Sequence, residues 1–283
     1  MTSVEKKQTT DGLTETELVS FLREELAELR QELSHERHTL NHEKEIAERV
    51  HRSLLPIAVR HQSIDVDVRH LSVEPLGNDY CQVRIPQDDP LACYISMCHV
   101  EGRGIASALL ASRISSEARH LIEGLFGPAD MVHSLNMFIY EYFHELDIRS
   151  SFMATRIDLT QRTVCFSGAD HPGGLLLRPN QGLAQRLASQ HSSIGRGPDI
   201  LYGDSQTMIG LKNGDRLLFF AAGITQNVNS AGQALGQSGL ATIAASTLSL
   251  GVFEMLDELI EQVKKHCGGP LQYDTTLVAV EIK

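Results

Sequence analysis

Apolar positions in the first part of the chain recur at steps of three and four residues. Between about 14 and 55 they fall at Val19, Leu22, Leu26, Leu29, Leu33, Leu40, Ala47, Val50 and Leu54. This is heptad spacing, and no Gly or Pro interrupts it before Pro56. Glu36 and Glu43 fall on the same seam and weaken it. We expect one long helix that pairs as a short coiled coil, frayed in its middle. The alternative is a single amphipathic helix docked on the following domain.

After Pro56 the pattern alternates between strand-like and helix-like periods. It predicts helices at 105–123, 128–146, 235–248 and 252–267, and strands at 63–71, 79–85, 91–100, 151–159, 162–169, 173–179, 205–211, 215–223 and 275–283. The strands between 151 and 179 have short turns and favour an antiparallel meander. Strands between two pairs of helices indicate an α+β fold, a four-layer α/β/β/α sandwich of two antiparallel sheets. We expect a disordered tail at 1–12, a coiled-coil or linker helix at 13–56 and a domain at 57–283.

Net charge and composition limit the classes of partner and the cellular compartment that we expect for this protein. A net charge of -11 argues against nucleic acid as the main partner, because phosphate binding needs a basic patch. No apolar run approaches the roughly 20 residues of a membrane span, and the polar N-terminus lacks a signal-peptide core. The five cysteines are scattered without a CxxC pair. These features predict a cytoplasmic protein with reduced thiols and no membrane segment.

Several strand ends carry residues that could do chemistry. A carboxylate and histidine metal centre could form from Asp79, His99, Glu101, Asp170, His171 and Asp274. The alternative is that these turn residues are structural, since Asp and Gly supply turn geometry. In the first helix, His35, His38 and His42 lie roughly on one face. We interpret them as solvated, because no carboxylate or Cys is fixed opposite them.

The order of these segments resembles the SpoIIE-type metal-dependent protein phosphatases, a branch of the protein phosphatase type 2C-like family. The likeness runs from about Glu48 to the C-terminus. It is carried by "VEPLGNDYCQV", "ISMCHVEGRGIASALLAS", "SFMATRIDL", "FSGADHPGGLLL", "LKNGDRLLFFAAGITQNVN" and "YDTTLVAVEI". The resemblance implies a hydrolase that holds two Mg²⁺ or Mn²⁺ ions with Asp carboxylates and acts in bacterial partner switching.

Carrying the family's metal ligands onto this chain leaves three of four carboxylates missing. Asp79 is present, but the bridging Asp falls on His99, and the other two fall on Ala222 and Tyr273, with Asp274 beside the latter. Imidazole offers one lone pair and cannot bridge two cations as a carboxylate does. We therefore expect no cofactor at physiological metal concentrations. Asp79, His99 and Asp274 are the residual metal-site candidates.

Other positions of the family motifs are retained or offer a substitute. Glu101 is a possible rescue ligand for one metal ion. The turn residues expected of the fold are kept at Gly77, Gly102, Gly104, His171, Gly214, Asp215 and Gly223.

Three functions remain open from the sequence, so enzyme activity is undecided. The first is a pseudophosphatase that binds a STAS-type anti-sigma antagonist or its kinase and dimerises through the helix. The second is an active phosphatase with an atypical Mn²⁺ or Mg²⁺ site formed by Asp79, His99, Glu101 and Asp274. The third is a coiled-coil adaptor whose globular part only caps an assembly.

Overall fold

The computed structural model describes residues 14–53, 56, 58–73, 77–102, 104–146, 148–179, 181–198 and 205–283. The chain divides into two compact units, Met1–Arg49 and Val50–Lys283. The tail expected at 1–12 lies outside the described residues, as do Leu54 and Leu55 at the end of the expected first helix. In the described part, no helix is long and apolar enough to cross a membrane.

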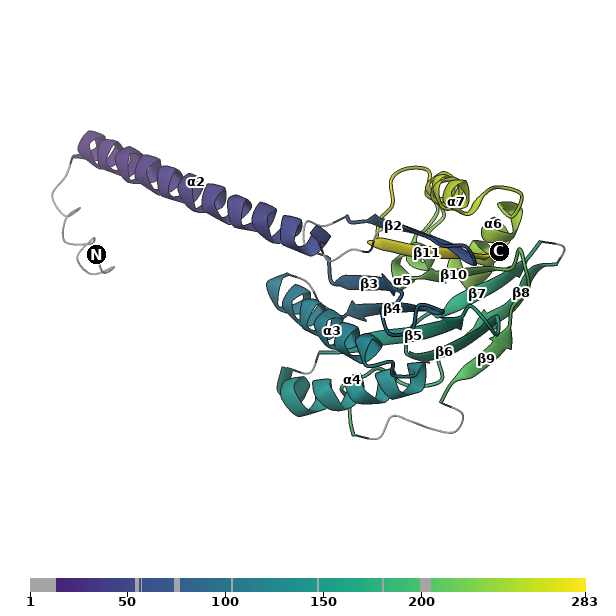
Figure 1. Cartoon of the computed structure of the whole chain (residues 1–283). Helices are drawn as coiled ribbons and strands as arrows, with labels where there is room; N and C mark the ends of the chain where they lie inside the picture. Colours follow the sequence, from purple (N-terminus) through teal and green to yellow (C-terminus); the bar gives the residue numbers. More distant parts are fainter. Residues whose placement is uncertain are drawn as a thin grey trace. The chain divides into compact units, whose positions relative to one another are not determined.

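The first unit contains most of one long helix, α2, which spans Glu15–Ser53 (Figure 1). Its sequence has no Gly or Pro and is rich in Glu, Leu and Arg, which are strong helix formers. His35, His38 and His42 are exposed on it, consistent with solvated side chains. Large apolar residues of the heptad seam are also exposed on this helix.

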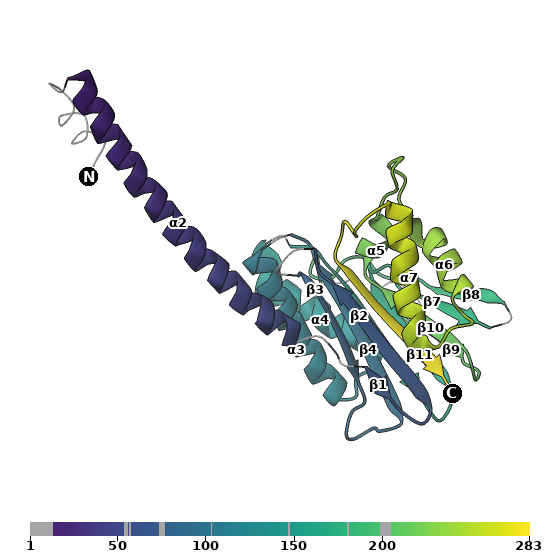
Figure 2. The same ribbon diagram turned by 90° about the horizontal axis from the view of Figure 1, so that it is seen from above.

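The second unit is built on two antiparallel sheets (Figures 1 and 2). The first has the strand order β1-β2-β11-β10-β7-β8 and the second the order β3-β4-β5-β6-β9. The strands are β1 Val59–Arg60, β2 Ile64–Leu71, β3 Asp79–Arg84, β4 Ala92–Val100, β5 Ser150–Asp158, β6 Thr163–Ala169, β7 Gly174–Arg178, β8 Gly182–Leu187, β9 Thr207–Gly210, β10 Arg216–Phe220 and β11 Thr275–Ile282.

Helices cover the outer face of each sheet. They are α3 Ile105–Glu123, α4 Pro128–Phe143, the short 3₁₀ turn η1 His144–Leu146, α5 Ala222–Gln226, α6 Gly236–Ser246 and α7 Val252–Cys267. Helices α3 and α4 lie on the β3–β9 sheet, whereas α5, α6 and α7 lie on the other (Figure 1). The predicted four-layer α+β sandwich is confirmed.

Three apolar layers hold the sandwich together, one between the sheets and one under each group of helices. Strand β4 shows why the run "LACYISMCHV" is nearly all apolar. Its Cys93, Ile95 and Met97 face the other sheet, and its Tyr94 and Cys98 face the helices. All five cysteines are free thiols, and burial raises the pKa of Cys93 to about 12.

The sequence-based element predictions miss the two-residue strand β1 and differ from the structure in three further places. The expected strand at 215–223 ends at Phe220, and Ala222 begins the short helix α5. Strand β8 was not predicted, because its sequence is short and mixed in polarity. The strands expected as one meander between 151 and 179 are divided between the two sheets. The chain changes sheet between β6 and β7, where Asp170 and Gly173 have positive φ.

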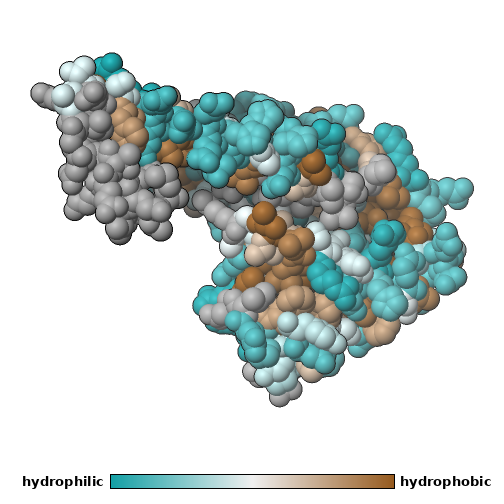
Figure 3. All heavy atoms as spheres, turned by 90° about the vertical axis from the view of Figure 1, so that its left-hand side faces the viewer, coloured by the Kyte–Doolittle hydropathy of each residue, from teal (hydrophilic) through white to brown (hydrophobic). Residues whose placement is uncertain are grey.

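Helices α3 and α4 also present an apolar surface to solvent. Ile105, Leu109 and Tyr142 are 62%, 64% and 65% exposed. Figure 3 shows apolar side chains gathered on this side of the second unit. The start of α3 follows directly on the glycine turn at the end of β4, so this surface begins beside the candidate site.

Candidate functional site

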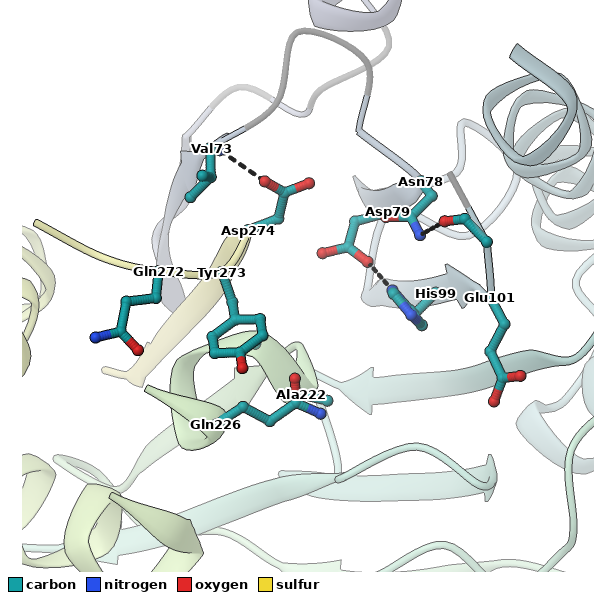
Figure 4. Close-up of a pocket in the computed structure, with 12 residues that line it drawn as sticks. Val73, Asn78, Asp79, His99, Glu101, Ala222, Gln226, Gln272, Tyr273 and Asp274 are labelled. Carbon is teal, nitrogen blue, oxygen red and sulfur yellow. Dashed lines mark hydrogen bonds and ion pairs between the residues drawn. The ribbon is translucent and has the colours of Figure 1, made fainter. Parts of the chain in front are cut away.

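The pairing of β3 with β4 brings Asp79 and His99 together. They are direct partners in the antiparallel register, so their side chains emerge on the same face of the sheet. The His99 Nδ1 atom lies 2.7 Å from Asp79 Oδ1, and the two side chains are 38% and 3% exposed. A separation of 20 residues in sequence therefore becomes one hydrogen-bonded carboxylate–imidazole pair (Figure 4).

This pair favours a charged imidazole. The hydrogen bond to Asp79 raises the pKa of His99, and the negative charges of Asp79, Glu101 and Asp274 add to it against the opposing effect of burial. Among the described residues that line the surrounding pocket, only His99 can carry a positive charge. The protonated, cationic form of this imidazole is therefore more favoured than in a free histidine, and the other charged groups of the pocket lining are carboxylates.

The opposite wall comes from the other sheet, where α5 meets the start of β11. Asp274 Oδ1 accepts a hydrogen bond from the backbone N–H of Val73 at 2.6 Å. Tyr273 is 43% exposed and Ala222 half-buried, and both line the pocket. A Cβ on Gly223 would lie 1.9 Å from the carbonyl oxygen of Asp274, so only glycine allows this approach of backbones.

Between the two walls lies a pocket of about 340 Å³. It is lined by Val73, Asn78, Asp79, His99, Glu101, Gly102, Ala222, Gly223, Gln226, Gln272, Tyr273 and Asp274. Figure 4 shows the side chains of Asp79 and Asp274 entering it from opposite sides, while the carboxylate of Glu101 points away from Asp79. Glu101 Oε2 instead lies 4.0 Å from Arg149 Nε.

The turn after β4 needs its glycines and a polar side chain that the sequence did not single out. Gly102 and Gly104 have φ of 112° and 88°, a region that favours glycine. Asn78 Nδ2 donates to the carbonyl oxygens of Val100 at 2.6 Å and Gly102 at 2.9 Å. Its position next to Asp79 was the available signal, but only the fold shows that it holds this turn.

Asp170 and His171 lie outside this pocket. They line a neighbouring cavity of about 590 Å³ that shares Ala222 with the first. Asp170 accepts a hydrogen bond from Ser193, and the His171 Nδ1 atom accepts one from the N–H of Gly173 at 3.0 Å. Burial, with the nearby charge of His99, lowers the pKa of His171 to about 3, so this imidazole is neutral.

The donor set does not fit a pair of hard divalent cations. Asp79 is hydrogen-bonded to His99, Asp274 bonds the Val73 backbone, and Ala222 and Tyr273 supply no carboxylate. In the part of the chain that the structure describes, no group of three His, Cys, Asp or Glu side chains could hold a metal ion. Hard cations need several oxygen ligands at once, so these side chains do not support a reaction step through such ions.

Solved structures place this sandwich in a known class, the PP2C phosphatase fold. The SiaA-PP2C domain of Pseudomonas aeruginosa matches with a TM-score of 0.74 and 15% identity, over 87% of this chain and 98% of that chain. The RsbU and RsbW domains of a Mycobacterium tuberculosis protein give 0.66 and 18%, over 81% and 63%. The phosphatase domain and regulatory fragment of SpoIIE from Bacillus subtilis give 0.64 and 16%, over 80% and 64%.

The sequence itself identifies the family. The family model described as Stage II sporulation protein E (SpoIIE) matches residues 90–283, which is more than half of the chain. The chain belongs to the SpoIIE family. A search of the curated proteins found no match.

Proposed function

We propose that the domain at 57–283 is a pseudophosphatase that binds a phosphorylatable regulator of the STAS type, or the kinase of that regulator. One observation carries the proposal. Three of the four carboxylate positions carried over from the family hold His99, Ala222 and Tyr273, and the remaining Asp79 is hydrogen-bonded to one of those replacements.

The backbone around the pocket supports a binding role, because the turns that shape the pocket are kept. Gly223 still permits the close approach to Asp274, and Gly102 and Gly104 still form the turn after β4. The pocket thus keeps its walls while its side chains change from metal ligands to hydrogen-bonding groups. His99 and Gln226 can donate hydrogen bonds to a phosphate or to a partner's side chains.

The surroundings of the pocket and the related structures support a protein as partner. Exposed Ile105 and Leu109 give the surface beside the glycine turn an apolar part, as the centres of protein interfaces have. One structural neighbour contains RsbU and RsbW domains in a single structure, and another includes a regulatory fragment of SpoIIE.

Metal binding and turnover test the loss of catalysis. We expect titration calorimetry of the full chain with Mn²⁺ or Mg²⁺ to detect no micromolar pair of sites, and a phosphoserine peptide to remain uncleaved. Micromolar binding of two metal ions would contradict the proposal. Turnover abolished by His99→Ala would establish the alternative, an active enzyme with an atypical site.

A rescue variant serves as the positive control. The combined change His99→Asp, Ala222→Asp and Tyr273→Asp restores the family's carboxylates to these walls. It should create measurable metal binding, because hard oxygen ligands would then converge from both sides of the pocket. If the folded variant binds no metal, the correspondence of these positions with the family's ligands is wrong.

Partner binding is tested with a purified STAS-domain regulator in its serine-phosphorylated and unmodified forms. We expect Tyr273→Glu, at the pocket, to weaken the complex at least roughly tenfold, which corresponds to about 1.4 kcal/mol. Met208→Glu on β9 is the control, because this 65% exposed side chain lies outside the pocket lining. Equal effects of the two variants, or no complex with either form, would contradict the proposal.

We also infer that α2 pairs with α2 of a second copy. Its heptad seam leaves Val19, Leu22, Leu26, Leu29 and Leu33 between 43% and 53% exposed, and a stripe of this kind is normally covered by another helix. Sedimentation of the full chain at micromolar concentration should give a dimer, and a monomer would refute the pairing.

A further inference from the structure

The charges beside the apolar seam of α2 carry information on how two copies would pair. With Val19, Leu26 and Leu33 at the a positions and Leu22 and Leu29 at the d positions, the heptad frame is fixed. These five side chains are 43–53% exposed on the isolated helix. The residues flanking such a seam, at the e and g positions, face the partner helix and decide its orientation.

The two flanks of the seam have opposite charge. The e positions hold Arg23, Arg30 and Arg37, and the g positions hold Glu25 and Glu32 in the first two heptads. Arg30 and Arg37, together with Leu26, Leu29 and Leu33, line one shallow hollow along the helix surface. A basic flank therefore runs beside the apolar seam, with acidic residues on the other side.

This distribution distinguishes the two possible orientations. In a parallel in-register pair, each g residue faces the e residue five positions later on the other helix, so Glu25 faces Arg30 and Glu32 faces Arg37, each twice. In an antiparallel pair, e faces e and g faces g, so with matched seams Arg30 would face Arg37, while Glu25 and Glu32 would face Ile46 and Thr39 in place of an arginine. Like charges at these positions destabilise a pair, whereas opposite charges steer it.

We propose that α2 of two copies pairs in parallel and in register, and that Glu25, Arg30, Glu32 and Arg37 select this orientation. This inference rests on the pairing of α2 proposed above. Both phosphatase-like domains then follow from the same end of the paired helices.

The seam also predicts where the pairing is strong. Glu36 and Glu43 occupy d positions, so in a parallel pair each meets its own copy in the second half of the helix. Polar residues in a seam set register at a cost in stability. Pairing is therefore strongest from Val19 to Leu33. Glu36→Leu with Glu43→Leu should tighten the dimer.

Charge reversal on the full chain tests the pairing scheme. Arg30→Glu with Arg37→Glu, and separately Glu25→Arg with Glu32→Arg, each turn four attractive contacts into repulsive ones. Each variant should raise the dimer Kd by roughly tenfold or more, since exposed pairs contribute about 0.3–0.5 kcal/mol each. The variant with all four changes restores the complementary arrangement and should dimerise like the wild type.

A matched control separates pairing from net charge. Glu24→Arg with Glu28→Arg makes the same charge change on the outer face of the helix, at f and c positions, and should leave the dimer Kd within about twofold. An antiparallel dimer would leave both reversed variants as stable as the wild type, which would overturn the orientation. A wild-type monomer would overturn the pairing while leaving the pocket proposal untouched.

Cross-linking measures orientation directly. Leu22→Cys lies near one end of the seam, so a parallel pair places the two new thiols side by side, whereas an antiparallel pair with matched seams places each against Ala47. We expect a disulfide-linked dimer under mild oxidation with Leu22→Cys. The outer-face control Glu24→Cys and the wild type, with its five thiols, should give none. A dimer that does not cross-link through Cys at 22 would overturn the proposal.

Discussion

The two walls of the pocket differ in their side-chain chemistry. On the wall formed by β3 and β4, one carboxylate remains and is joined to an imidazole, as Asp79 and His99. On the wall formed by α5 and β11, the backbone approach of Gly223 to Asp274 remains, but Ala222 and Tyr273 hold no carboxylate. Under the proposed function, the backbone shape of the site is kept although its side-chain chemistry differs from that of a metal centre.

At neutral pH, the largest effect should come from filling the tight backbone contact between Gly223 and Asp274. Gly223→Ala would place a Cβ 1.9 Å from the Asp274 carbonyl oxygen, which requires β11 or α5 to move. We expect a loss of about 3 kcal/mol of unfolding free energy, measured by urea denaturation. Gly210→Ala is the control, because nothing lies within 4 Å of the added atom. Similar losses of unfolding free energy in both variants would mean that the close contact between α5 and the start of β11 is not the cause.

Lowering the pH should affect the stability of the folded chain differently through His171 than through His99. The pKa of His171 falls to about 3 in the folded chain, so below pH 6.5 the unfolded state binds one more proton. This group should therefore remove about 1.4 kcal/mol of stability per pH unit between pH 6.5 and about 3. His171→Asn keeps an acceptor for the Gly173 N–H and should lack that slope. Parallel stability–pH curves for the two proteins would refute this account.

Loss of charge at Asp79 should have a smaller effect with the opposite pH dependence. The folded pKa of His99 is raised, so the stabilisation by the pair is complete below the unfolded pKa and is lost as pH rises through the folded pKa. Asp79→Asn should cost about 1 kcal/mol near pH 6, discounted because His99 is 38% exposed and screened by solvent.

The opposite wall supplies the control for that change. Asp274→Asn keeps an oxygen that can accept from the Val73 N–H and removes only a minor contribution to the His99 pKa, so its cost should be lower and depend less on pH than that of Asp79→Asn. The His99 pKa, followed by NMR, should fall in Asp79→Asn and change less in Asp274→Asn. Equal falls would mean that the hydrogen bond is not the main cause.

The smallest effect should come from one restored carboxylate. Ala222→Asp adds a side chain to a half-buried position of the open pocket, so we expect a stability change within about 0.5 kcal/mol. Calorimetry should detect no micromolar Mn²⁺ binding, because a single added ligand does not complete a two-metal site. Tight binding by this variant alone would show that the pocket is nearer to a metal centre than its hydrogen bonds indicate.

Much of the fold follows from local pattern. The helices expected near 105–123 and 252–267 are found there, because apolar periodicity and flanking glycines mark their ends. Strand β8 and the early end of β10 were missed, since both depend on packing that local propensity does not encode. The division of β5–β8 between two sheets likewise depends on long-range pairing.

The sequence by itself determined the α+β sandwich, the heptad seam and the residues at the four positions that match the family's metal-ligand motifs. Spacing and residue type are local properties, so they can be seen without coordinates. Only the tertiary structure decided that Asp79 and His99 are register partners, that Glu101 points away from Asp79 and that Asn78 holds the turn. Hydrogen bonds act over about 3 Å, so they form only between residues that the fold brings side by side. Which residues these are depends on the pairing of distant strands, and local sequence does not specify that pairing.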